Sequence, residues 1–112
     1  MSDVEKTVYQ KEMYSIRDIK SNTFTAPFIA GTGDEARRIF GDMCYFGGDN
    51  LIARHPEDYQ LYHLGYFDIS SGIVSPTESL PTYVISASEI INIYKERYSK
   101  QVADTDELVE AV

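Results

Sequence analysis

Residues 59–69, YQLYHLGYFDI, give the strongest indication of the fold. Aromatic and aliphatic side chains occupy both of its alternating sets of positions, which is typical of a strand buried on both faces. The Ser-Ser-Gly sequence at residues 70–72 predicts a tight turn, after which residues 73–75 return as a partner strand. Strict alternation places Tyr62 and Tyr66 on one face. We therefore expect this strand at the centre of a sheet.

Two strands and a helix are predicted upstream of this stretch. Residues 12–19 and 23–30 show the alternation and the β-branched and aromatic content of strands, and the Lys-Ser-Asn sequence between them is a turn signal. Pro27 predicts an edge position or a bend in the second strand. Apolar side chains recur at helical spacing over residues 34–46 and predict a helix with one buried face.

Downstream, residues 82–85 predict a short strand that leads into a second helix. Ser86 and Glu89 match a capping box, in which the serine and glutamate side chains satisfy free backbone amides at the start of a helix. The order strand, strand, helix, three strands, helix favours an α+β fold. We expect a single small domain, a mostly antiparallel sheet of about five strands with two helices packed on one face.

The charge of the chain is unevenly distributed. Its 112 residues carry a net charge of −8, and the segment 101–112 contributes four acids and no base. We divide the chain into a flexible leader (1–10), an α+β domain (11–99) and an acidic tail (100–112) that we expect to be disordered. An acidic chain is not what the electrostatics of nucleic-acid binding favours. One hypothesis is that the tail covers a basic surface and competes with nucleic acid.

Composition also indicates the environment of the protein. No apolar run approaches the roughly 18 residues that a membrane helix needs, and the N-terminus lacks the pattern of a signal peptide. Cys44 is the single cysteine, so an internal disulfide is impossible and a reducing compartment is the simple interpretation. We expect a soluble, intracellular protein with no membrane partner.

Two features superficially match catalytic or cofactor motifs. The pattern Gly31-x-Gly33-x-x-Ala36 resembles a dinucleotide fingerprint, but Asp34 and the acid after it place negative charge where a pyrophosphate would bind. Cys44 falls in the C-terminal half of the first predicted helix, where the helix does not lower a thiol pKa. A strand-to-helix turn and a buried cysteine are the favoured interpretations, and we expect no catalytic residue and no cofactor.

One group of residues has the chemistry of metal ligands, namely His55, Glu57, Asp58 and His63. Its spacing does not match a zinc motif, and no pair of cysteines supports it. We favour a turn that begins at Pro56, with acids that cap exposed backbone amides, and we expect no metal.

Nine tyrosines are the most unusual feature of the composition. If the strands pair as predicted, Arg17 and Arg54 lie near Tyr62 and Tyr66. Aromatic rings on a sheet with basic neighbours hold single-stranded nucleic acid by stacking and phosphate attraction. Tyrosines that simply pack in the core are the alternative.

A further pair of bases, Arg37 and Arg38, lies on the exposed face of the first predicted helix. Helical ion pairs of Arg38 with Asp34 and Asp42 are favoured over a phosphate contact. The candidate nucleic-acid-binding residues are thus Arg17, Arg37, Arg38, Arg54, Tyr62 and Tyr66.

A series of short motifs carries a family resemblance. They are YSIRD (14–18), APF (26–28), DEARR (34–38) with Phe40 and Asp42, HPEDY (55–59), LY (61–62), GYFD (65–68) and the turn at 71–72. In order and spacing the series resembles the small nonstructural protein of gokushoviruses, single-stranded-DNA phages of the microvirus group, over about residues 13–90. The resemblance implies a DNA-binding protein of the infected bacterial cytoplasm, absent from the capsid, with a part in genome synthesis or in the switch to packaging. It implies no catalytic residues.

Two hypotheses of different classes follow. The first is a phage nonstructural protein that binds single-stranded DNA or a replication complex, as an oligomer formed through sheet edges. The second is an acidic, tyrosine-rich adaptor that binds a host or phage protein and no nucleic acid, since tyrosine suits protein interfaces equally well. Salt-sensitive binding to DNA distinguishes the two.

Overall fold

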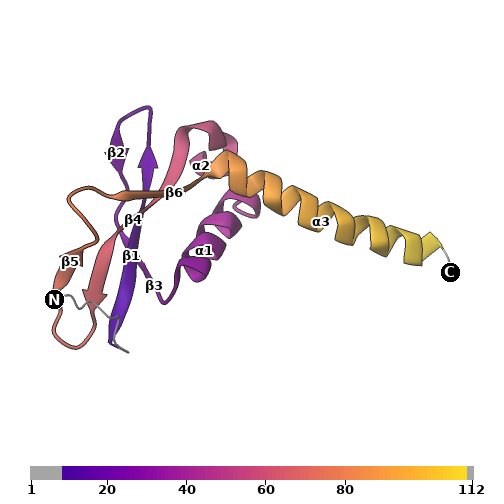
Figure 1. The fold of residues 1–112 in the computed structure, drawn as a ribbon. Helices are drawn as coiled ribbons and strands as arrows, with labels where there is room; N and C mark the ends of the chain where they lie inside the picture. Colours follow the sequence, from indigo (N-terminus) through magenta and orange to yellow (C-terminus); the bar gives the residue numbers. More distant parts are fainter. Residues whose placement is uncertain (1–8, 111–112) are drawn as a thin grey trace.

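The computed structural model describes residues 9–110 of the chain, with side chains described over residues 9–99. At its centre are two long antiparallel strands, β1 (Gln10–Asp18) and β4 (Tyr59–Asp68) (Figure 1). The prediction of a central strand at residues 59–69 is confirmed, because β4 has partner strands on both of its edges.

Four short strands complete the sheet, and every pairing in it is antiparallel. They are β2 (Thr23–Phe24), β3 (Phe28–Ala30), β5 (Val74–Pro76) and β6 (Thr82–Ser86). β2 and β3 pair with β1, whereas β5 and β6 pair with β4. The sequence predicts one strand over residues 23–30, but Pro27 has no amide hydrogen for a ladder, and the chain divides around it into β2 and β3. The sheet therefore has six strands instead of about five.

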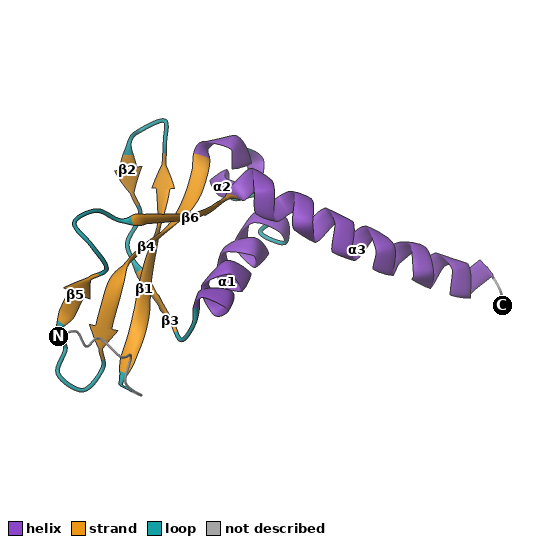
Figure 2. Ribbon diagram, in the orientation of Figure 1, coloured by secondary structure: helices purple, strands orange, loops and turns teal. Residues whose placement is uncertain are grey.

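The helical elements are α1 (Gly33–Tyr45), α2 (Leu51–Arg54), the 3-10 turn η1 (Pro56–Asp58) and α3 (Ala87–Glu110). Figure 2 shows the two long helices, α1 and α3, on one side of the strands. The expected α+β architecture, an antiparallel sheet with helices on one face, is confirmed. None of the helices within residues 9–110 combines the length and the hydropathy that a membrane span requires.

Side-chain caps explain where two of the helices begin. The Thr32 hydroxyl accepts a hydrogen bond from the Glu35 amide at 3.1 Å and starts α1. The sequence predicts a loop where α2 forms, because this single turn depends on Asn50. The side-chain oxygen of Asn50 accepts from the Ala53 amide at 2.8 Å, while its nitrogen donates to the carbonyls of Met43 and Gly47.

The start of α3 agrees with the predicted capping box. The Ser86 hydroxyl accepts from the Glu89 amide at 3.1 Å and donates to the Glu89 carboxylate at 3.2 Å. α3 then leaves the body of the domain and projects outward as far as Glu110, so its backbone includes residues 100–110 of the expected tail (Figure 1). The division into leader, domain and disordered tail stays a prediction, and residues 1–8 of the leader lie outside the described residues.

The core lies between the sheet and the two long helices. Its buried apolar residues are Tyr14, Ile16, Ala30, Ala36, Phe40, Cys44, Tyr59, Leu61, Ala87, Ile90 and Tyr94. β1 contributes its even-numbered side chains to this core, so its odd-numbered side chains face the other side of the sheet. That second face carries the candidate site.

A β-bulge interrupts the pairing of the two central strands. Tyr14 pairs with His63, whereas Met13 pairs with Gly65, so β4 has one residue more than β1 at this point. The extra residue is Leu64. A bulge of one residue reverses the alternation of the strand beyond it.

The reversal places Tyr62 and Tyr66 on opposite faces of the sheet, and the prediction that they share a face is wrong. The ring of Tyr62 contacts that of Phe24, with 5.4 Å between centroids. The ring of Tyr66 contacts that of His63 on the helical side, with centroids 5.3 Å apart. Strict alternation fails here because the bulge follows from the pairing of two strands.

Candidate nucleic-acid interface

The sheet face turned away from α1 and α3 is called here the open face. It consists first of the odd-numbered residues of β1 and the residues that pair with them on β2, β3 and β4. It also includes the residues of β5 and β6 that pair with this set on β4. Together these are Lys11, Met13, Ser15, Arg17, Phe24, Ile29, Gln60, Tyr62, Gly65, Phe67, Val74, Pro76, Tyr83 and Ser86. Two of these residues are basic and none is acidic. The open face is therefore aromatic, aliphatic and weakly cationic, although the chain as a whole is acidic.

Four side chains of the open face form one cluster, called here the Tyr62 cluster: Arg17, Phe24, Tyr62 and Tyr83. Tyr62 lies between the two other rings, and its centroid is 5.4 Å from that of Phe24 and 5.8 Å from that of Tyr83, both edge-to-face. Phe24 and Tyr83 are 44% and 46% exposed. The cluster thus presents two accessible rings, a geometry suited to stacking with flat ligands.

A second bulge brings Tyr83 into the cluster. Leu61 pairs with Ile85, whereas Tyr62 pairs with Tyr83, which leaves Val84 as the extra residue of β6. Without this bulge, the register of Leu61 with Ile85 would place Val84 opposite Tyr62. The two bulges of the sheet therefore determine which aromatic rings meet on the open face.

Arg17 supplies the positive charge of the cluster. Its Nη1 donates to the Tyr62 hydroxyl at 3.4 Å, its Nη2 donates to the Asn22 side-chain oxygen at 2.5 Å, and its guanidinium carbon lies 6.0 Å from the centroid of the Tyr62 ring. These contacts are all with neutral groups. Among the described residues Arg17 forms no ion pair, so its charge is not neutralised by a carboxylate.

A carboxylate lies at the edge of the cluster and fixes Tyr83. The Tyr83 hydroxyl donates to the Glu89 carboxylate at 2.8 Å. Desolvation and this bond raise the pKa of the Tyr83 hydroxyl, while hydrogen bonds from Tyr83 and Ser86 lower the pKa of the Glu89 carboxyl. The same glutamate therefore caps α3 and orients one ring of the open face.

The remaining predicted arginines do not join Arg17. Arg54, on α2, forms an ion pair with Asp49 at 3.7 Å. Arg37 and Arg38 lie on α1, on the helical side of the sheet, and it is Arg37 that pairs with Asp34, at 3.3 Å. Of the six predicted residues, the structure brings together Arg17 and Tyr62.

Phe24 and Tyr83 were not among the residues predicted from the sequence. Each lies in a short strand, in which too few residues alternate to indicate a face. The signal that identifies them is register, since Phe24 pairs with Arg17 and Tyr83 with Tyr62.

Tyr66 belongs to a polar group on the opposite face. The Tyr14 hydroxyl donates to the Glu12 carboxylate at 2.5 Å, and the rings of Tyr14 and His63 stack with centroids 4.6 Å apart. His63 Nε2 lies 4.0 Å from the same carboxylate. Burial first, and then Glu12, raise the pKa of the Tyr14 hydroxyl. His63 is thus held between the rings of Tyr14 and Tyr66, with its Nε2 facing the Glu12 carboxylate.

Three of the four residues with metal-ligand chemistry do come together. Ligand atoms of His55, Glu57 and Asp58 lie within 4.8 Å of one another near the surface. They surround η1, which begins at Pro56, so the predicted turn is confirmed. Exposed acidic groups of this kind are common at turns.

The two motifs that resemble catalytic sites have structural roles. The Gly31 amide donates to the Glu35 carboxylate at 2.8 Å, so an acid lies where a phosphate would bind a dinucleotide turn. Cys44 is buried in the core, and burial raises the pKa of its thiol to about 12. A thiol in that environment stays protonated near neutral pH.

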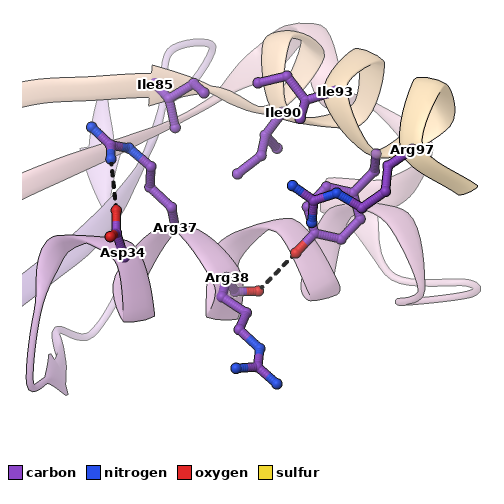
Figure 3. A pocket seen from close by; sticks show the side chains of 8 residues that line it. Asp34, Arg37, Arg38, Ile85, Ile90, Ile93 and Arg97 are labelled. Atoms are coloured by element: carbon purple, nitrogen blue, oxygen red, sulfur yellow. Dashed lines mark hydrogen bonds and ion pairs between the residues drawn. The ribbon is translucent and has the colours of Figure 1, made fainter.

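A cavity of about 370 Å³, called here the α1–α3 groove, lies on the helical side (Figure 3). Its lining residues are Asp34, Arg37, Arg38, Ile85, Ile90, Ile93, Tyr94 and Arg97. Figure 3 shows the side chain of Arg38 pointing out of the groove, while its carbonyl accepts from the Tyr94 hydroxyl at 3.3 Å. Arg37, paired with Asp34, and Arg97 border the isoleucine side chains of the groove.

Comparison with known proteins gives two matches. The family model described as Phage ORF5 protein matches residues 11–90, which include α1 and all of the sheet except Gln10. The curated Protein ORF5 of Chlamydia phage 1 is 32% identical over 79 residues, covering 68% of this chain and 82% of that protein. No solved structure matches significantly. Chlamydia phage 1 is a phage of the gokushovirus type, so the resemblance seen in the sequence motifs is confirmed.

Proposed function

This chain belongs to the phage ORF5 protein family, and from that premise we propose that it binds single-stranded DNA on the open face of its sheet. In this proposal it acts stoichiometrically as a nonstructural protein in the cytoplasm of the infected host. Binding to the displaced or newly made strand would regulate genome synthesis or the switch to packaging. The observation that carries the proposal is the Tyr62 cluster.

The cluster has the two components that single-strand recognition uses. Bases stack on accessible aromatic rings, and Phe24 and Tyr83 offer such rings on either side of Tyr62. Arg17 carries a charge that no described carboxylate neutralises, and it lies beside Tyr62, where it can meet a phosphate. Duplex DNA does not suit this surface, because its bases are already stacked on one another.

The acidity of the chain limits the electrostatic part of the binding. The open face has two bases in register, Lys11 and Arg17, so about two phosphate contacts are available. For a single strand, log Kobs changes with log salt by about −0.7 per contact, which predicts a slope of about −1.4. Stacking must supply most of the affinity, so binding should depend on the aromatic rings more than on salt.

Fluorescence anisotropy with labelled single-stranded and duplex DNA, at low and physiological salt, tests the proposal. Tyr62→Leu removes the ring against which Phe24 and Tyr83 both pack, and it should weaken single-strand binding about 5- to 150-fold, because stacking contributes about 1–3 kcal/mol per base. Tyr66→Leu is the matched control, since it makes the same change on the same strand but on the opposite face, and it should change affinity less than twofold. Equal losses in both variants would contradict the assignment of the site.

The adaptor hypothesis is supported by the same surface. Exposed large apolar side chains of the open face include Phe24, Ile29, Val74 and Tyr83, and a contiguous apolar patch is typical of a protein interface. If the wild-type protein binds neither form of DNA at low salt, the open face is a docking surface for a phage or host protein. Binding to the single strand with the slope given above excludes a purely protein-binding role.

A further inference from the structure

The α1–α3 groove is a second cationic surface, and the proposed DNA site does not use it. The groove lies between the two long helices on the side of the sheet opposite the open face (Figure 3). Ile90 and Tyr94 are buried beneath it, whereas Ile93 on its α3 side is 47% exposed. Ile93 therefore contributes exposed apolar area at the edge of a cavity of about 370 Å³.

Arg97 gives this surface a charge that no described carboxylate neutralises. Its guanidinium carbon lies 5.6 Å from the centroid of the Tyr94 ring, a cation–π contact. Among the described residues it forms no ion pair, whereas Arg37 across the groove is paired with Asp34. The groove therefore offers a free guanidinium next to exposed apolar area, which suits a segment that is both acidic and apolar.

The C-terminal end of the same chain has that chemistry. Residues 101–112 contain Asp104, Asp106, Glu107 and Glu110, with no base, together with Val102, Leu108 and Val109. α3 has 24 residues, about 36 Å at 1.5 Å per residue, and its later turns project away from the domain (Figure 1). Because α3 is one continuous helix, Asp104 lies about 10 Å along the axis beyond Arg97, and its end does not return to its own groove.

We propose that the α1–α3 groove receives the acidic end of α3 from a second copy of this chain. The two α3 helices would pair antiparallel about a two-fold axis near residues 100 and 101. In that register Arg97 of one copy is level with Asp104 of the other, and Ile93 is level with Leu108. A two-fold interface repeats each contact, so every dimer has two such charge pairs and two such apolar pairs.

Sedimentation equilibrium of the full chain tests the dimer. The wild type should show a reversible monomer–dimer equilibrium whose dissociation constant rises with salt. Arg97→Glu should raise the dissociation constant at least about tenfold, since the substitution acts twice in a symmetric dimer and replaces attraction by repulsion. Lys95→Glu is the matched control, with the same charge change on the same helix at a residue outside the groove, and it should change the constant less than threefold.

A charge exchange distinguishes the proposed pair from a general effect of charge. Asp104→Arg alone should weaken the dimer as Arg97→Glu does, and the double variant Arg97→Glu/Asp104→Arg should return the dissociation constant to within about threefold of the wild type. Circular dichroism of each variant establishes that it is folded. A wild type that stays monomeric, a dimer insensitive to Arg97→Glu, or a double variant that is not rescued would each overturn the proposal.

Disulfide trapping provides an independent measurement of the register. When Arg97→Cys and Asp104→Cys chains are mixed and oxidised, they should form a mixed disulfide faster than either variant forms one with itself. Cys44 is buried and stays outside this reaction. Homodimeric disulfides that form as fast as the mixed one would exclude the antiparallel register.

Discussion

Gly41 marks the place where α1 and α3 are in closest contact. A Cβ atom at this position would lie 2.5 Å from atoms of the Tyr94 ring, well inside van der Waals contact. The Tyr94 hydroxyl donates to the Asp42 carboxylate at 3.0 Å, and burial followed by this bond raises the pKa of Tyr94 to about 12. The ring therefore has little freedom to move away.

Gly41→Ala should destabilise the protein. Alanine gains up to about 1 kcal/mol of helix propensity over glycine, but forcing a buried ring out of position costs about 1–3 kcal/mol and disturbs the bond to Asp42. Urea denaturation should show a lower midpoint. Gly31→Ala is the control, because the nearest atom to its Cβ would be 3.7 Å away, and it should leave the midpoint nearly unchanged. A Gly41→Ala variant as stable as the wild type would show that Tyr94 can relocate.

Among the elements, the start of α3 combines capping with a titratable group. The Glu89 carboxylate accepts hydrogen bonds from Tyr83 at 2.8 Å and Ser86 at 3.2 Å, and these bonds lower its pKa below the ordinary value of 4.5. A carboxyl whose pKa is lower in the folded state stabilises that state above the unfolded pKa. The stabilisation is lost as pH falls through the folded pKa.

Glu89→Gln should therefore lower the melting temperature at pH 7, and its difference from the wild type should shrink as the pH falls below about 4. The measurement is a series of thermal melts between pH 7 and pH 3. Glu96→Gln is the matched control on the same helix, at a residue with no hydrogen bond or ion pair among the described side chains. A Glu89→Gln difference that is constant over this pH range would rule out the carboxylate as the source of the stabilisation.

The central strand shows how elements depend on one another. A Cβ on Gly65 would lie 2.1 Å from the Ser75 carbonyl oxygen, so glycine lets β5 approach β4 beyond the bulge at Leu64. The sequence indicates that this segment is a strand and that it is central. It does not indicate the bulge, because the extra residue is defined only relative to β1.

At the scale of the whole molecule, much of the negative charge belongs to the end of the chain that projects from the domain. The radius of gyration is 17.3 Å, whereas a compact domain of this length has about 13 Å, and the projecting α3 accounts for the difference (Figure 1). Half of the net charge of −8 lies in residues 101–112, beyond the domain that carries the open face. If the open face binds DNA as proposed, the charge of these residues would act on that DNA at a distance.

Replacing the four acids of the tail by amides (Asp104→Asn, Asp106→Asn, Glu107→Gln, Glu110→Gln) should strengthen single-strand binding severalfold at low salt. The gain should vanish at physiological salt, where charges more than about 8 Å apart are screened. Anisotropy titrations at matched salt, below the concentration at which the chain dimerises, measure this effect. Unchanged affinity at low salt would remove the tail from DNA binding.

Much of the fold could be predicted from local patterns. The order of elements, the capped start of α3, the buried stripe of α1 and the interruption at Pro27 each depend on residues close together in the chain. The family resemblance likewise rests on short motifs in order, and it is confirmed. Arg17 and Tyr62 were identified because they lie on long, regular strands.

The side of the sheet on which each side chain lies follows from the pairing of distant strands and could not be predicted from local patterns. Tyr66 leaves the predicted site and Tyr83 enters it, because each change follows a one-residue bulge in the pairing of two strands. Arg37 and Arg38 separate from Arg17 because α1 packs on the other side of the sheet (Figure 2). The elements, their order and the family can be read from local sequence patterns, since these depend on neighbouring residues. The assembly of the site depends on register between distant segments, and register exists only once the strands have paired.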